Sequence, residues 1–325
     1  MLTQLRAWLK TQFSALGHRL GTGRLGTGRL HTWLVALFSL TLGLSLVLQA
    51  CDRSIASSFP APNRPGADYT DRMAQEHKGD RPIATPLSQM EPQQPVATQR
   101  VDYATINGKT ITGFLAQPAN AEAPLPALIA IHEWWGLNDN IEAVSQRLAG
   151  EGYSVLAVDL YGGELAEAPD QARSLMQGVM ADPEPAQENL RQAYEYLINQ
   201  QQATGVASIG WCFGGAWSLN TALLLPEQLD AAVIYYGRLQ TDPEVLAPLQ
   251  MPIAGFFGGL DQGIPVADVK AFEAALRSLG KTAEIYIYDD ANHAFSNPSG
   301  DRYNPEAAAD AWEKTIAFLA KYLKA

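Results

Sequence analysis

The sequence predicts an α/β protein with a mostly parallel central sheet and helices on both faces. Short, continuous apolar runs alternate with helix-like segments over about 220 residues, and this alternation is typical of a parallel sheet linked by helices. The run at 127–131 (ALIAI) shows no polar alternation, as expected of a strand whose two faces are both buried. An apolar fraction of 47% is enough to supply one sizeable core.

The predicted elements follow one another in a regular order. Residues 101–106 and 110–116 each alternate well enough for a strand, and Asn107-Gly108 between them is typical of a hairpin turn. Further strands are expected at 127–131, 154–160, 206–209, 231–236, 253–258 and 284–288. Helices are expected at 140–150, 186–201, 216–225, 266–280 and 305–322.

Residues 1–51 have the composition of a signal peptide or membrane anchor. Residues 1–50 contain five basic residues and no acid, and the run 33–48 is uncharged. The run ends in Leu48-Gln49-Ala50-Cys51, which resembles a bacterial lipobox apart from Gln49. Cleavage there would leave Cys51 as a lipidated N-terminus, and an uncleaved anchor is the alternative. We therefore expect an exported lipoprotein or anchored protein, tethered to a membrane through this segment, with its catalytic domain outside the cytoplasm.

Residues 52–97 are rich in Pro, Ser, Gln and Asp and show little apolar periodicity, so we expect a disordered linker. The folded domain is then expected at 98–325. Residues 51–325 carry 34 acidic and 18 basic side chains, and such an excess of negative charge argues against a nucleic-acid partner. Apart from Cys51 the exported part holds a single cysteine, and an unpaired thiol in an oxidising compartment suggests a chemical role.

That cysteine lies in the sequence Gly210-Trp211-Cys212-Phe213-Gly214, between an apolar strand and a helix. Strand, tight turn and helix form the setting of a nucleophile elbow, in which the turn lifts the nucleophile above the sheet edge. Glycines flank the nucleophile because a β-carbon there would collide with a neighbouring element. The alternative is a glycine-rich turn around a small buried cysteine.

A thiol nucleophile needs a base, and a group that orients the base. His293 lies in a loop after the last strand, where it can reach the carboxyl edge of the sheet. Asp261 follows the strand 253–258 and is the favoured orienting acid, with Asp289 and Asp290 as rivals. His132 is interpreted as a strand-end residue.

The loop after the strand at 127–131 supplies further candidates. The backbone N–H groups of Phe213 and Trp134 are the expected oxyanion donors, because this architecture takes one from the residue after the nucleophile and one from an early loop. Glu133 follows an all-apolar strand, so it is either a structural acid or a neighbour of the thiol. His132 and Glu133 lack further ligands at suitable spacing, and no metal site is expected.

Taken together, these motifs resemble the dienelactone hydrolase family of α/β-hydrolases. The resemblance covers roughly residues 98–325 and rests on five segments in the family's order: 132–136 (HEWWG), 157–162 (AVDLYG), 210–215 (GWCFGG), 259–261 (GLD) and 291–295 (ANHAF). It implies the α/β-hydrolase fold and a triad of Cys212, His293 and Asp261. It also implies that Glu133 bonds the resting thiol and helps to deliver a thiolate when substrate binds.

The chain departs from the family where the substrate carboxylate would bind. Members acting on dienelactone hold that carboxylate with arginine, one of them just after the catalytic histidine, and here that segment reads 295–298 (FSNP). Arg238 and Arg302 are the nearest substitutes. Trp135 and Tyr236 are expected to line the substrate pocket, among other aromatic residues.

We therefore expect a hydrolase that cleaves a small ester or lactone through an acyl-enzyme, without a cofactor and with no evident protein partner. Two alternatives remain open. One is a tethered binding protein that kept the fold and lost turnover. The other is a thiol oxidoreductase, against which the lack of a C-x-x-C pair weighs.

Overall fold

A computed structural model describes residues 66–82, 84, 90–121 and 124–324. The expected signal or anchor at 1–51, including Cys51, lies outside these residues. Within the described part of the chain, no helix has the length and apolarity needed to cross a bilayer. Pro62–Ala325 forms one compact unit.

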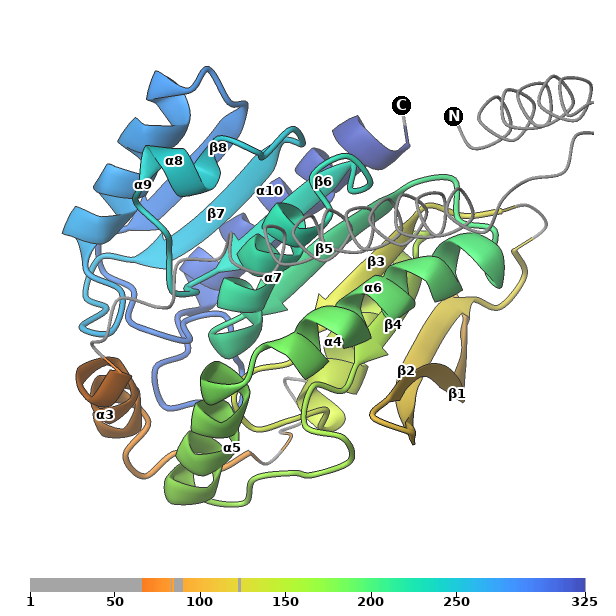
Figure 1. The fold of residues 1–325 in the computed structure, drawn as a ribbon, viewed down its shortest axis with the longest axis horizontal. Coiled ribbons are helices and arrows are strands. Elements are labelled where there is room, and N and C mark those ends of the chain that lie inside the picture. The colour runs from red at the N-terminus through yellow and green to blue at the C-terminus, as the bar shows by residue number, and fades with distance from the viewer. Residues whose placement is uncertain (1–65, 83, 85–89, 122–123, 325) are drawn as a thin grey trace, which may run out of the picture. The chain divides into compact units, whose positions relative to one another are not determined.

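Eight strands form one sheet in the order β1-β2-β4-β3-β5-β6-β7-β8 (Figure 1). Their bounds are β1 Val96–Ile106, β2 Lys109–Pro118, β3 Ala127–Ile131, β4 Ser154–Val158, β5 Val206–Trp211, β6 Ala231–Tyr235, β7 Ile253–Gly258 and β8 Ala283–Tyr288. Strand β2 pairs antiparallel with β1 on one side and with β4 on the other, and every other pairing is parallel. The predicted mostly parallel sheet is confirmed.

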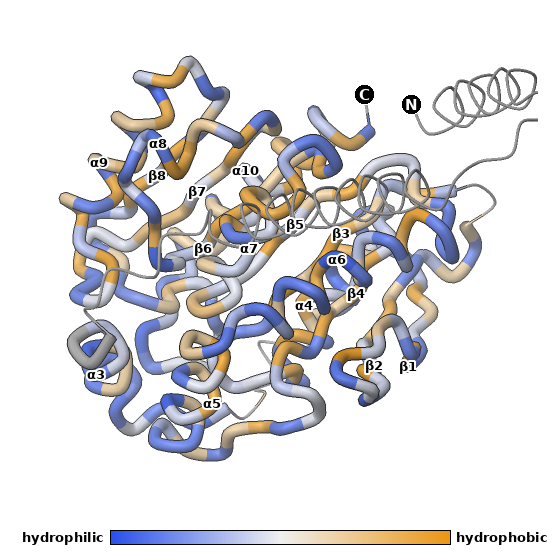
Figure 2. The backbone as a smooth tube through the Cα atoms, in the orientation of Figure 1, coloured by the Kyte–Doolittle hydropathy of each residue, from blue (hydrophilic) through white to orange (hydrophobic). Residues whose placement is uncertain are grey.

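Helices cover both faces of the sheet. The main ones are α4 Asp139–Gly150, α6 Glu184–Asn199, α7 Phe213–Leu224, α9 Val266–Ser278 and α10 Pro305–Leu323. Helices α6 and α7 lie in front of the sheet and α10 lies behind it (Figure 1). Helix α4 shares the face of α10, because the Arg147 guanidinium stacks on the Trp312 ring at 3.8 Å. The central strands are strongly hydrophobic (Figure 2), as burial between two helical layers requires.

Two helices of the domain lie where none was expected. Helix α5, Pro169–Ala181, begins at a proline and has only Ala172 and Met176 fully buried. Helix α8, Pro243–Leu246, is a single turn that begins at a proline.

The expected linker at 52–97 is wrong in two places. Strand β1 already begins at Val96, and Gly66–Glu76 forms helix α3. Tyr69, Met73 and His77 are 4%, 0% and 2% exposed, so this segment packs on the domain rather than extending into solvent. The three residues are spaced four apart and form one narrow stripe on an otherwise polar helix. The segment therefore has the composition of a linker, although its three buried side chains anchor it to the domain.

Candidate active site

Cys212 stands on a strained turn between β5 and α7. Its backbone has φ +55°, a region that a side-chain-bearing residue adopts only when its surroundings enforce it. A β-carbon on Gly210 would overlap the carbonyl of Gly214, and one on Gly214 would overlap the carbonyl of Ile131. The glycines therefore allow the strand, turn and helix to approach closely enough for the elbow. This geometry is the one that the sequence predicts.

His293 and Asp261 meet beside the elbow, after strands β8 and β7. The Nδ1 atom of His293 lies 2.7 Å from Oδ2 of Asp261, and both side chains are fully buried. The other carboxylate oxygen of Asp261 accepts the backbone N–H groups of Gly263 and Ile264, each at 2.8 Å. The carboxylate is thus held from both sides, and Asp261, rather than Asp289 or Asp290, is the partner of the imidazole.

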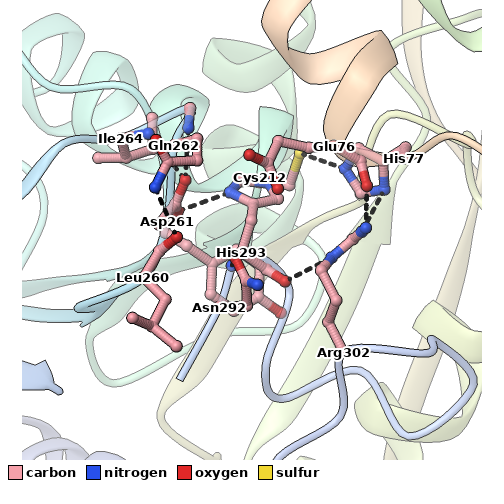
Figure 3. Close-up of polar contacts among 12 residues, drawn as sticks. Glu76, His77, Cys212, Leu260, Asp261, Gln262, Ile264, Asn292, His293 and Arg302 are labelled. Atoms are coloured by element: carbon pink, nitrogen blue, oxygen red, sulfur yellow. Dashed lines mark hydrogen bonds and ion pairs between the residues drawn. The ribbon is translucent and has the colours of Figure 1, made fainter. Parts of the chain in front are cut away.

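The other imidazole nitrogen of His293 faces the thiol. A ring nitrogen of His293 lies within 4.8 Å of the Cys212 sulfur, and its Nε2 atom has no other hydrogen-bond partner among the described residues (Figure 3). A buried nitrogen without a hydrogen bond costs free energy, and in native proteins such an atom often has a catalytic role. Its position beside the sulfur allows proton transfer after a small side-chain movement.

The charges of this pair favour the ionised forms. Burial opposes ionisation of Cys212, but His293 and, after it, His77 outweigh this effect and lower the pKa of the thiol to about 6. Burial also opposes the imidazolium of His293, but the carboxylate of Asp261 and the charge of Cys212 raise its pKa well above its ordinary value. Both shifts support a thiolate–imidazolium pair near neutral pH.

Glu133 lies two residues after β3 and interacts electrostatically with the thiol. It is 5% exposed, and its Oε2 atom accepts a hydrogen bond from the Asn297 side-chain amide at 2.7 Å. Burial, and after it the charge of Cys212, raises the pKa of Glu133 to about 7. The acid also lines a cavity of about 250 Å³, together with Trp211, Tyr236 and Asn297. Glu133 therefore lines this cavity and is close enough to Cys212 to sense its charge.

The loop after β3 is held by His132. Its Nδ1 atom lies 2.6 Å from the Glu133 carbonyl, and its Nε2 atom accepts the backbone N–H of Leu160 at 3.1 Å. Because both ring nitrogens are used, the neutral ring fits the site, and burial lowers the pKa of His132. His132 therefore acts on the loop conformation, as expected for a strand-end residue.

The two expected oxyanion donors lie on the elements that the sequence indicated. Phe213 is the first residue of α7, whose N-terminus begins at the nucleophile and carries a partial positive charge. Trp134 follows Glu133 in the loop after β3 and is fully buried. The two expected donors therefore come from two different elements, helix α7 and the loop after β3.

The expected substrate-binding residues occupy different surroundings. The Tyr236 ring packs against His293 at 5.3 Å between centroids, and its hydroxyl lies 2.8 Å from Oγ of Ser296. Trp135 is 3% exposed and packs edge-on against His77. Arg238 stacks its guanidinium over the ring of Tyr69 at 5.1 Å, so in this structure it holds helix α3.

Sequence reasoning missed one residue of the site, His77. Its Nε2 atom lies 3.9 Å from the Cys212 sulfur, on the side opposite Asp261 (Figure 3). Its ring packs on Trp134 at 4.4 Å between centroids, and its Nδ1 atom lies 2.7 Å from the Asp80 carboxylate. The buried stripe that His77 shares with Tyr69 and Met73 is the signal that could have found it.

Arg302 fastens the segment that carries His77 to the loop of His293. Its Nε atom donates to the His293 carbonyl at 3.0 Å, and its Nη2 atom pairs with Asp80 at 2.6 Å. A further bond runs from Nη1 to the Glu76 carbonyl. The arginine that the sequence offered as a substrate ligand is therefore engaged here, and the thiol beneath the segment is only 1% exposed.

Comparisons with known proteins agree with this geometry. The model of the dienelactone hydrolase family matches residues 111–323. A Saccharolobus solfataricus protein named "Putative carboxymethylenebutenolidase" is 33% identical over 255 residues, covering 67% of this chain and 96% of that protein.

Solved structures give the same result. The crystal structure of a Klebsiella pneumoniae protein named "Putative Dienelactone Hydrolase" superposes with a TM-score of 0.64 at 27% identity, covering 70% of this chain and all of that one. A dienelactone hydrolase of Anabaena variabilis shares the fold with a TM-score of 0.54 at 19% identity, covering 70% of this chain and 99% of that one.

Proposed function

The chain belongs to the dienelactone hydrolase family, and we propose that it hydrolyses a small ester or lactone with Cys212 as nucleophile, His293 as base and Asp261 as orienting acid. The contact that carries this proposal is the 2.7 Å pair between His293 and Asp261, which turns the free Nε2 atom of the imidazole toward the thiol on its elbow. A turn aspartate and a surface histidine would have no reason to meet in a fully buried pair beside a cysteine.

The first half of the reaction forms an acyl-enzyme. The Cys212 thiolate attacks the carbonyl carbon, and the carbonyl π electrons move onto oxygen to give a tetrahedral oxyanion. The amides of Phe213 and Trp134 are proposed to hold this charge, at about 2.7–4 kcal/mol per donor in comparable sites. The oxyanion collapses, the carbon–oxygen bond to the leaving group breaks, and the His293 imidazolium protonates the departing alkoxide.

The second half releases the acid. Neutral His293 takes a proton from water, and the hydroxide formed attacks the thioester carbon. Collapse of the second oxyanion breaks the carbon–sulfur bond and restores the thiolate, while His293 is again cationic. Asp261 keeps the imidazole oriented and stabilises its charge in both halves. The cycle consumes one water and needs no cofactor.

The cavity beside Glu133 is the proposed entry for the acyl group. It offers apolar walls from Trp211 and Trp312 and volume for a small substrate. Arg238 and Arg302 are both engaged with the segment 66–82, whereas Arg147 lines the cavity and is the candidate partner for a substrate carboxylate. Glu133 would then meet the substrate before the thiol does.

The test is a panel of small p-nitrophenyl esters and lactones, each with and without a carboxylate, assayed on wild type and Cys212→Ala. We expect turnover in the wild type that is lost in the variant. Binding of these compounds without turnover would instead favour a non-catalytic binding protein, for which the covered thiol is the supporting observation.

We also propose that residues 1–51 direct export and tether the domain to a membrane. The support is their composition, with five basic residues, no acid in residues 1–50 and an uncharged run at 33–48. Cell fractionation tests the location, and the mass of the mature N-terminus tests lipidation. Cys51→Ser should release the protein from membranes if Cys51 carries the lipid, and leave it bound if the anchor stays uncleaved.

A further inference from the structure

The strongest feature outside the proposed chemistry is a cluster of three metal-ligating atoms. Sγ of Cys212 and one ring nitrogen each of His77 and His293 all lie within 4.8 Å of one another, and all three residues are buried. The separation of His77 Nε2 from the sulfur is 3.9 Å, close to the roughly 3.5 Å that a tetrahedral zinc with bonds of about 2.0 and 2.3 Å would impose. Small side-chain rotations would bring the three atoms onto one ion.

Both histidines are held as metal ligands usually are. The Nδ1 atom of His77 lies 2.7 Å from Asp80, and the Nδ1 atom of His293 lies 2.7 Å from Asp261. A carboxylate that accepts from the far nitrogen leaves the lone pair of the near nitrogen for the ion. At His77 the Nη2 atom of Arg302 also lies 3.0 Å from Nδ1 and pairs with the same Asp80 carboxylate, so the arginine competes with the imidazole for Asp80. The base of a triad requires one such carboxylate–histidine pair, and here two of them face the same sulfur.

The hydrogen-bond count of the cluster also indicates a cation. When each Nδ1 atom donates to its carboxylate, the sulfur and the two Nε2 atoms share a single proton, and in the thiolate–imidazolium form the lone pair of His77 Nε2 faces the thiolate. The Nε2 atom of His293 is buried and has no hydrogen-bond partner other than Cys212 itself among the described residues. An ion with open coordination positions satisfies the sulfur and both nitrogens at once.

We propose that Cys212 Sγ, His77 Nε2 and His293 Nε2 form a three-ligand site for Zn²⁺ with the fourth position open. One thiolate and two imidazoles are the ligand set that selects zinc over the hard cations calcium and magnesium. Binding forms the zinc–sulfur bond and both zinc–nitrogen bonds, and it releases to solvent the proton that Cys212 and His293 share. The ion would join the segment 66–82 to the sheet edge.

The effect on catalysis rests on the proposed function. A sulfur lone pair bound to zinc is withdrawn from attack on a carbonyl, and His293 coordinated through Nε2 can no longer accept a proton. Zinc should therefore hold the enzyme in a closed, inactive form from which a chelator releases it. Zinc binding itself does not depend on whether Cys212 is a nucleophile.

The probes are Zn²⁺ and Co²⁺ added to the full chain carrying Cys51→Ser, so that Cys212 is the one remaining thiol. We expect one metal per chain, a thiolate-to-cobalt charge-transfer band, and intense visible bands of four-coordinate cobalt. Adding Cys212→Ala should remove the charge-transfer band. His77→Ala should weaken Zn²⁺ binding in competition with a chromophoric chelator, and Asp80→Asn should weaken it by about 10- to 100-fold.

Asp80→Asn removes a charge behind the ligand while keeping the side-chain shape, so it remains informative if His77→Ala fails to fold. As a matched control, Asp290→Asn should leave the affinity unchanged. Absence of the cobalt–sulfur band, or Zn²⁺ binding of equal strength in wild type, His77→Ala and Asp80→Asn, would overturn the site. Zinc binding by a chain without esterase activity would sink the proposed function alone, and esterase activity insensitive to zinc would sink the metal site alone.

Discussion

Met73→Ala tests whether the segment 66–82 controls access to the thiol. Met73 is fully buried, and its methyl group fills the space that a β-carbon on Gly263 would occupy, two residues from Asp261. A buried methionine truncated to alanine costs about 2–5 kcal/mol. If the segment 66–82 opens as a local unit, the substitution lowers the free energy of that opening by this amount. The stability of the sheet core then stays the same.

The lower figure, about 2 kcal/mol, corresponds to a rise of about 30-fold in the population of the open form. Cys212 is 1% exposed in the closed form, so its alkylation by iodoacetamide should accelerate by at least that factor. The assay is intact-protein mass spectrometry over time, at native pH and without metal, in the Cys51→Ser background. Denaturant unfolding of the same samples shows whether the domain as a whole stays folded.

The matched control is Gln75→Ala, since Gln75 is exposed on the same helix and its truncation removes no buried contact. Alkylation of that variant should stay within about twofold of the parent. Equal rates for the parent and Met73→Ala would contradict the covering role of the segment. A parent thiol that reacts as fast as a free cysteine would contradict it as well.

Three further outcomes follow from the site. Cys212→Ser should keep the fold and lose most activity in the ester assay, because a serine hydroxyl has no accessible anionic form at neutral pH; full turnover would exclude a thiolate nucleophile. Asp261→Asn should lower kcat by up to about 10⁴-fold with little change in KM, because the imidazole loses its orienting charge; an unchanged kcat would leave Asp261 a turn residue. The lowered pKa of His132 means that the unfolded chain binds more protons below pH ~6.5, so the free energy of unfolding should fall on acidification by up to about 1.4 kcal/mol per pH unit. Denaturant titrations of His132→Gln at several pH values should lack this part of the pH dependence of the free energy of unfolding. An identical pH dependence in the variant would mean that a group other than His132 takes up the proton.

The parts of the site that the sequence predicted are those with a strict local geometry. The elbow requires glycines at 210 and 214 because backbone atoms approach there, and such a requirement is visible in a single sequence. Asp261 and His293 were predicted from their positions after parallel strands, because strand ends meet at one edge of the sheet. Local rules were sufficient for the proposed triad.

The parts that the sequence did not predict depend on contacts between distant segments. Asn297 bonds Glu133 across 164 positions, and Arg302 bonds Asp80 across 222, and no local pattern specifies either pair. His77 was missed for a different reason. Helix α3 carries few apolar residues, so composition indicated a linker, and only the spacing of Tyr69, Met73 and His77 shows its buried side.

The most direct measurement of the hydrolytic mechanism is the fate of the sulfur during turnover. The metal-free protein in the Cys51→Ser background is mixed rapidly with p-nitrophenyl acetate and quenched in acid, and the acetyl group is located by peptide mass spectrometry. We predict a burst of close to one equivalent of p-nitrophenol, with an acetyl thioester on Cys212 that is absent in His293→Ala. Steady turnover with an unmodified Cys212, retained in Cys212→Ala, would contradict covalent catalysis by this thiol.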